Sequence, residues 1–131
     1  MSRILVTLLV LVLLAGCSGG ASASSASAKL RITVWPQGKN SGSVTYTLVC
    51  PRATGTLPAA HSACSKLRRI GIRAFAPVPA NTACTAIYGG PQIARVSGRL
   101  AGRSIKAGFQ RTNGCEIARL SRLAFLFPLL K

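Results

Sequence analysis

Four cysteines place the strongest constraint on how this chain can fold. Cys50, Cys64, Cys84 and Cys115 lie in a stretch of about 100 residues that follows an apolar N-terminus. A domain of this size buries little apolar surface, so covalent bridges contribute much to its stability. Outside the cytoplasm, four cysteines indicate two disulfides, and the sequence leaves all three pairings open. Neither zinc nor another cofactor is indicated, because the cysteines form no close pairs and His61 is the only histidine.

The N-terminus predicts export from the cytoplasm. Residues 4–15 are apolar except for one threonine. At about 12 residues this run is shorter than the roughly 20 that span a bilayer, so residues 1–16 are predicted to be a signal peptide. Leu-Ala-Gly-Cys at residues 14–17 has the form of a bacterial lipobox, which implies cleavage before Cys17 and a lipid on its sulfur. An ordinary secretion signal is the alternative.

The segment after the signal is predicted to be a tether. Residues 17–28 hold the lipidated cysteine and then only Ser, Gly and Ala, which have neither the charge nor the bulk to build a core. One folded domain is predicted over residues 29–131. Because two or three acyl chains anchor a protein stably, we expect an extracytoplasmic protein held at the cell membrane by the lipid on Cys17.

The composition excludes most catalytic chemistry. The chain has 17 Lys and Arg against a single acidic residue, Glu116. A glycosidase needs two carboxylates and a Ser-His-Asp triad needs its aspartate, so the chain can build neither site. His61 is expected to lie on the surface or at a helix cap, and we predict that the protein is not an enzyme.

The basic charge predicts attraction to anionic partners, among them phospholipid headgroups and cell-envelope polymers. The cations are nevertheless dispersed along the sequence, with Arg68 and Arg69 as the only adjacent pair. Aromatic residues are also too few to form a stacking surface for bases. Nucleic-acid binding is therefore not predicted.

The pattern of apolar residues predicts an α+β domain. Alternation of apolar and polar side chains indicates strands, and helical spacing of apolar residues between Pro58 and Gly71 indicates a helix. A second, short helix is expected after Asn113 and Gly114. Strands are expected over residues 30–35, 44–50, 93–97, 103–109 and 123–127. For the last of these, the alternative is a membrane contact.

Residues 83–88 stand out because chain breakers bracket them. Residues 77–81 are rich in proline and Gly-Gly-Pro occupies residues 89–91, so neither a helix nor a central strand is expected between them. We interpret the segment as an exposed, extended loop that Cys84 ties to the domain. Such a segment has the form that a serine protease accepts in its cleft as a β-strand.

Several motifs together resemble those of the Streptomyces subtilisin inhibitor family of secreted bacterial protease inhibitors, over residues 30–127. The chain has Gly-Thr-Leu-Pro at residues 55–58, Ala-Cys-x-x-Leu at residues 63–67 and Asn-Gly-Cys-Glu at residues 113–116. Cys-Thr-Ala-Ile-Tyr at residues 84–88 is similar to the reactive loop of the family, Cys-Pro-x-Val-Tyr.

The resemblance implies a five-stranded antiparallel sheet with two short helices, and a homodimer. It also implies the sequential disulfides Cys50–Cys64 and Cys84–Cys115.

The resemblance further implies that Ala86–Ile87 is the reactive bond, with Ala86 as the P1 residue that enters the protease S1 pocket. The loop residues that would contact the enzyme beside this bond are Ala83, Cys84, Thr85 and Tyr88. Thr85 departs from the proline of the family, which loosens the loop. Alanine at P1 lacks the positive charge that trypsin selects, so a subtilisin-like or elastase-like serine protease is the expected partner.

Three functions are therefore compatible with the sequence. The first is inhibition of an extracellular serine protease through this loop. The second is a basic surface lipoprotein that binds anionic cell-envelope polymers without inhibiting any protease. The third is a structural or signalling relative of the inhibitors, in which the loop is cut as a plain substrate.

Overall fold

The computed structural model describes residues 27–130. The predicted signal peptide, the lipid on Cys17 and nearly all of the predicted tether lie outside these residues. Within the described range, no helix combines the length and the apolar character that crossing a membrane requires.

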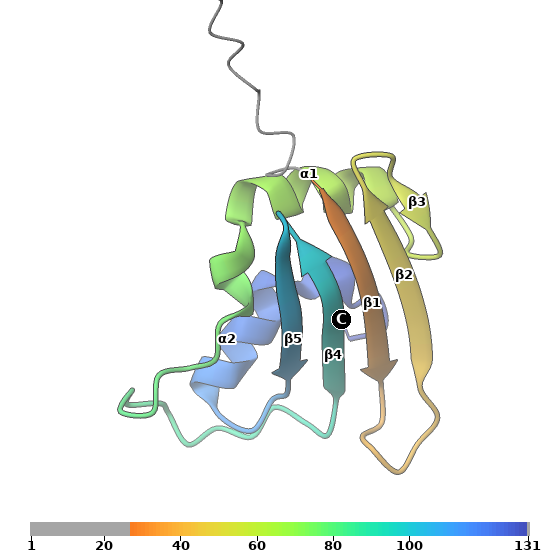
Figure 1. The fold of residues 1–131 in the computed structure, drawn as a ribbon. Coiled ribbons are helices and arrows are strands. Elements are labelled where there is room, and N and C mark those ends of the chain that lie inside the picture. The colour runs from red at the N-terminus through yellow and green to blue at the C-terminus, as the bar shows by residue number, and fades with distance from the viewer. Residues whose placement is uncertain (1–26, 131) are drawn as a thin grey trace, which may run out of the picture.

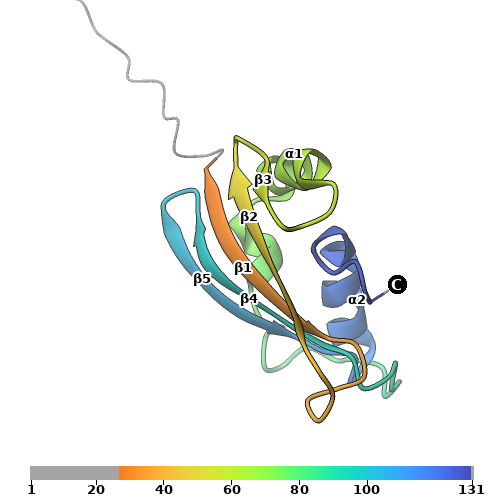
Figure 2. The same cartoon turned by 90° about the vertical axis from the view of Figure 1, so that its right-hand side faces the viewer.

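The described residues form one five-stranded antiparallel sheet with the helices packed on one of its faces (Figures 1 and 2). The strand order is β3-β2-β1-β4-β5. The strands are β1 Ala28–Trp35, β2 Val44–Cys50, β3 Thr54–Gly55, β4 Ile93–Leu100 and β5 Arg103–Phe109. The predicted fold class is confirmed, as are both disulfides, Cys50–Cys64 and Cys84–Cys115.

The central strand β1 explains why the sheet has one dry face and one open face. Its residues alternate between buried apolar side chains, such as Ile32 and Val34, and side chains on the other face, such as Lys29 and Arg31. The same alternation runs through β4, which pairs with β1 along its whole length. A two-residue period of this kind is typical of an antiparallel sheet that packs on one face only.

The first helix, α1, covers Ala60–Ile70 and is the helix expected after Pro58. Its buried side chains are Ala63 and Leu67, which lie one helical turn apart and face the sheet. The helix ends where expected, at Gly71, whose positive φ of 65° suits a residue without a side chain. A short 3-10 helix, η2, follows over Ile72–Phe75.

The second predicted helix is α2, Gly114–Arg122. Its N-cap is Asn113, whose Oδ1 accepts a hydrogen bond of 3.0 Å from the backbone N–H of Glu116. This contact satisfies one of the backbone donors that every helix start leaves free. The start of α2 is therefore fixed by its own sequence.

One predicted strand is wrong. Residues 123–127 are not a strand but lead through the 3-10 helix η3, Ala124–Leu126, to the end of the described chain. Three of this segment's apolar side chains are buried, with Leu123, Leu126 and Phe127 inaccessible to solvent, whereas Phe125 is only partly buried. The fifth strand of the sheet is instead the short β3, which pairs with β2 and was not predicted.

Candidate functional site

Residues 77–92 connect η2 to β4 and contain neither helix nor strand, as expected. The loop lies beyond one end of the sheet, opposite the end where β1 begins (Figure 1). Two of the four exposed large apolar side chains among the described residues are neighbours in this loop, Ile87 at 56% and Tyr88 at 67% exposure. Their exposure makes these two side chains available to contact another molecule.

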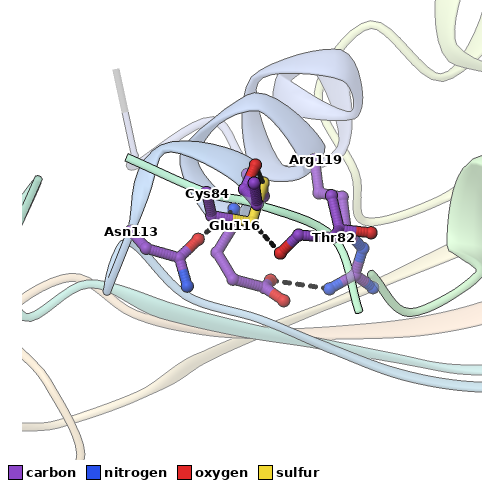
Figure 3. The surroundings of a disulfide bond; sticks show 7 residues. Thr82, Cys84, Asn113, Glu116 and Arg119 are labelled. Atoms are coloured by element: carbon purple, nitrogen blue, oxygen red, sulfur yellow. Dashed lines mark hydrogen bonds and ion pairs between the residues drawn. A yellow bond between two sulfur atoms is a disulfide. The ribbon is translucent and has the colours of Figure 1, made fainter. Parts of the chain in front are cut away.

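A disulfide makes the first attachment of this loop. Cys84 is bonded to Cys115, which lies in the first turn of α2, with 5.4 Å between the two Cα atoms (Figure 3). The dashed line from Cys84 Sγ to the Thr82 carbonyl oxygen in Figure 3 spans 3.6 Å. Because a bridged sulfur carries no hydrogen, this approach is a close contact and not a hydrogen bond. The bridge therefore fixes the loop to the helix at the residue two positions before Ala86.

A backbone hydrogen bond makes the second attachment. The N–H of Gly114 donates to the carbonyl oxygen of Thr85 at 3.0 Å. The two chains approach so closely here that a Cβ atom on Gly114 would collide with the Thr85 side-chain oxygen. Glycine at position 114 thus allows the loop to lie directly against the start of α2.

The third attachment is on the other side of the predicted reactive bond. The N–H of Gly89 donates to the carbonyl oxygen of Arg111 at 2.7 Å. A Cβ atom on Gly89 would approach the Ile117 side chain to 2.8 Å, so this contact also depends on a missing side chain. The three residues from Ala86 to Tyr88 therefore span the space between two fixed points.

The exposed segment contains one tight bend. The N–H of Ile87 donates to the carbonyl oxygen of Thr85 at 2.9 Å, which centres a three-residue γ-turn on Ala86. The expectation of a continuously extended segment did not include this turn. Its consequence is that Ala86 lies at the apex of the exposed segment.

The first turn of α2 is itself held rigidly. Glu116 forms a 2.7 Å ion pair with Arg119, and both side chains are largely buried, at 15% and 11% exposure (Figure 3). The Arg119 guanidinium also lies over the ring of Phe109, with its carbon 4.6 Å from the ring centre. The only acidic residue of the sequence is thus engaged in a structural pair at the base of the loop.

The structure brings the predicted loop residues together and leaves other candidates apart. Ala83, Thr85, Ala86, Ile87 and Tyr88 are all exposed, and Cys84 is partly buried in its bridge. His61, by contrast, is exposed on α1. Among residues 27–130, no group of three or more His, Cys, Asp or Glu side chains could hold a metal ion.

The sequence did not reveal the backbone contacts that hold the loop. Gly114 was expected only to precede the second helix, and neither Gly89 nor Arg111 was expected to contact another part of the chain. These contacts join positions more than 20 residues apart through main-chain atoms, which leave no side-chain signal in the sequence. The only indication in the sequence that glycine has a role near the loop was Gly-Gly-Pro at residues 89–91.

Comparison with family models and with curated protein sequences identifies no relative. No family model matches the chain, and no curated protein sequence is significantly similar to it. The family resemblance of the motifs therefore stays a prediction.

Proposed function

We propose that this protein inhibits an extracellular serine protease by presenting the bond Ala86–Ile87 to its active site. The observation that carries the proposal is the attachment of the loop on both sides of this bond. Cys84 and Thr85 are tied to α2 on one side, and Gly89 is tied to Arg111 on the other. A short exposed segment between fixed ends is what a tight substrate-like inhibitor needs.

The attachments favour binding by reducing its entropic cost. A protease cleft binds an extended peptide through main-chain hydrogen bonds and side-chain pockets. A free peptide loses conformational freedom on binding, at about 1–2 kcal/mol for the backbone of each residue that is fixed. In this loop the main chain on either side of the bond is already fixed on folding, so only residues 86–88, with the γ-turn at Ala86, must still adjust to the cleft, and more of the contact energy remains for binding.

The same attachments oppose product release. Cleavage between Ala86 and Ile87 would leave Cys84 on one fragment and Cys115 on the other, and the disulfide joins them. The hydrogen bond from Gly89 to Arg111 would hold the new N-terminal end close to the body of the protein. The new amine at Ile87 would therefore stay near the acyl group on Ala86, so the bond would be remade more often than the product departs.

The small side chain of Ala86 bears on which protease is inhibited. It carries no charge for the cation-selective S1 pocket of trypsin and fits the pockets of subtilisin-like and elastase-like enzymes. The chain itself contributes no catalytic residue to this mechanism, because the reaction uses the serine and histidine of the bound protease.

The position of the loop is compatible with a lipid anchor. Ala28, where β1 begins, lies about seven residue steps of an antiparallel strand, or about 24 Å, from Trp35 at the loop end of the sheet. A tether from a lipid on Cys17 would therefore join the domain at the end away from the loop. Such an anchor would leave the loop accessible to a protease outside the membrane.

Titration with proteases of known active-site concentration tests the proposal. We expect one molecule of inhibitor to block one molecule of subtilisin or elastase, with weak inhibition of trypsin. Ala86→Lys should shift the preference toward trypsin, whereas Ala80→Lys should not, because that exposed position adds the same charge to the same loop away from the bond. If both lysine variants change the inhibition constants equally, or neither does, the assignment of the reactive bond is wrong.

A further inference from the structure

The open face of the sheet, which the helices leave uncovered, carries exposed cations and no acidic residue. Its exposed cations come from three adjacent strands, and all lie on the face that the helices leave uncovered (Figure 2). They are Lys29 and Arg31 on β1, Arg95 and Arg99 on β4, and Lys106 on β5. The only acidic residue of the chain, Glu116, is paired with Arg119 in α2 and supplies no counter-charge to this face.

The strand register brings these cations close to one another. Lys29 lies directly opposite Arg99 in the antiparallel pairing of β1 with β4. Arg31 lies opposite Ser97, which places both Arg95 and Arg99 on its diagonals. Directly opposite side chains in a sheet are about 5 Å apart at Cβ, and diagonal ones about 7–8 Å. Like charges at such spacing destabilise the folded state, so folding alone does not account for them.

The shape of the face suits a broad partner. The residues that share these cross-strand rows with the cations are short and mostly polar. The sheet curves around the helices, which makes the open face convex (Figure 2). These neighbours are Thr33, Thr45, Thr47, Val49, Ser97, Ser104 and Gly108.

We propose that this open face binds the surface of an anionic phospholipid bilayer. Juxtaposed Lys and Arg side chains are attracted to anionic headgroups, and this attraction adds to the binding from a lipid anchor. The chain that leads back to Cys17 joins the domain at Ala28, beside the row formed by Lys29 and Arg99. The eleven residue steps from Cys17 to Ala28 can span at most about 40 Å, so a lipid on Cys17 would keep the domain, and this face with it, close to the membrane.

This orientation does not conflict with the proposed inhibition. The loop lies at the start of α2, on the helix side of the molecule, and not on the open face. Trp35 lies at the loop end of the face, with Arg95 5.7 Å from the centre of its ring. A domain lying on the bilayer through its open face would therefore keep Ala86 exposed.

Self-association through the same face would bring the cations of two copies together, which electrostatic repulsion opposes.

Vesicle binding tests the proposal. The full-length chain carrying Cys17→Ser, so that no acyl group contributes, is titrated with vesicles of phosphatidylglycerol or of phosphatidylcholine. The test variant adds Lys29→Gln and Arg31→Gln on the open face. The control adds Arg68→Gln and Arg69→Gln, two exposed cations on α1, and so removes the same net charge.

We expect a strong preference for phosphatidylglycerol, which falls as salt is raised because mobile ions screen the attraction. Removing a cation near the surface lowers the partition coefficient about fivefold, so the open-face variant should bind phosphatidylglycerol about 25-fold more weakly. The control variant should lose far less. The readout is the ratio of the partition coefficients for the two lipids, because the apolar residues 4–15 are common to all the proteins.

Three results would overturn the proposal. Equal losses in the two double variants would show that net charge, and not this face, determines binding. An absence of preference between the lipids would exclude electrostatic docking. Binding to soluble inorganic polyphosphate without binding to phosphatidylglycerol vesicles would assign the face to a polymer and not to a membrane.

Discussion

Removing the two disulfides one at a time separates the stability of the domain from the function of the loop. The first variant carries Cys84→Ser and Cys115→Ser, and the second carries Cys50→Ser and Cys64→Ser. The bridges close sequence separations of 31 and 14 residues. On the chain-entropy model their removal costs about 3.7 and about 3 kcal/mol of unfolding free energy. The two variants should therefore be destabilised to within about 1 kcal/mol of each other.

The effects on inhibition should differ. Without its bridge to Cys115, the loop is held by the backbone hydrogen bonds of Thr85 and Gly89, each worth about 1 kcal/mol. Ordering the backbone of one residue costs about 1–2 kcal/mol. If this variant must order one or two more residues on binding than the natural protein does, its inhibition constant for subtilisin is about 10- to 100-fold higher. Cys50 ends β2 beside Ala28, at the end of the sheet away from the loop, so the second variant should inhibit normally.

The assay combines urea denaturation, which gives the unfolding free energy, with inhibition measured where both variants are fully folded. The first variant should also be cut faster and lose its inhibition over time, because no covalent bond retains the cleaved ends. Equal inhibition by the two variants would refute the reasoning that the bridge to α2 prepares the loop. So would a loss confined to the Cys50–Cys64 variant.

Two further predictions concern single side chains. Gly114→Ala should weaken inhibition about 3- to 10-fold, the equivalent of losing the hydrogen bond to the Thr85 carbonyl, and adding Thr85→Ala should restore part of it because the colliding oxygen is removed. Gly42→Ala, where a Cβ meets no atom within 4 Å, is the matched control, and an equal loss there would contradict the contact. Lys29→Glu should raise the unfolding free energy by about 0.2–1 kcal/mol by placing opposite charges across from Arg99. A fall in stability measured by urea denaturation would contradict the repulsion between these positions.

The strands and helices with clear periodicity could be predicted from the sequence. Alternation located β1 and β2 to within two residues, and the apolar spacing before Gly71 located α1. The disulfide pairing came from the family resemblance, because the cysteine positions alone left three possibilities open.

The end of the chain was predicted wrongly because its apolar run was read by composition and not by spacing. Four apolar side chains in this run are buried: Leu123, Leu126, Phe127 and Leu130. The last three follow Leu123 by three, four and seven positions. This is a helical spacing, whereas a continuous apolar run by itself does not distinguish a buried strand from a helical turn. The strand β3 was missed for another reason: its two residues are too few to show alternation.

The candidate site was predictable in its position but not in its attachments. Breakers around residues 83–88 identified an exposed loop, and Cys84 indicated a covalent tie. The γ-turn at Ala86 and the main-chain bonds of Gly89 and Gly114 depend on how α2 packs beside the loop. That packing is a property of the folded domain and is not visible in the loop sequence itself.

Identification of the bond that a protease cuts shows whether Ala86–Ile87 is the reactive bond. The protein is incubated with a catalytic amount of subtilisin, and its mass and N-terminal sequences are followed before and after reduction. We expect a slow gain of one water, a new N-terminus at Ile87, fragments that separate only on reduction, and a stable mixture of cut and intact protein. Rapid and complete degradation, or a first cut at any other bond, would contradict the proposed inhibition through this bond.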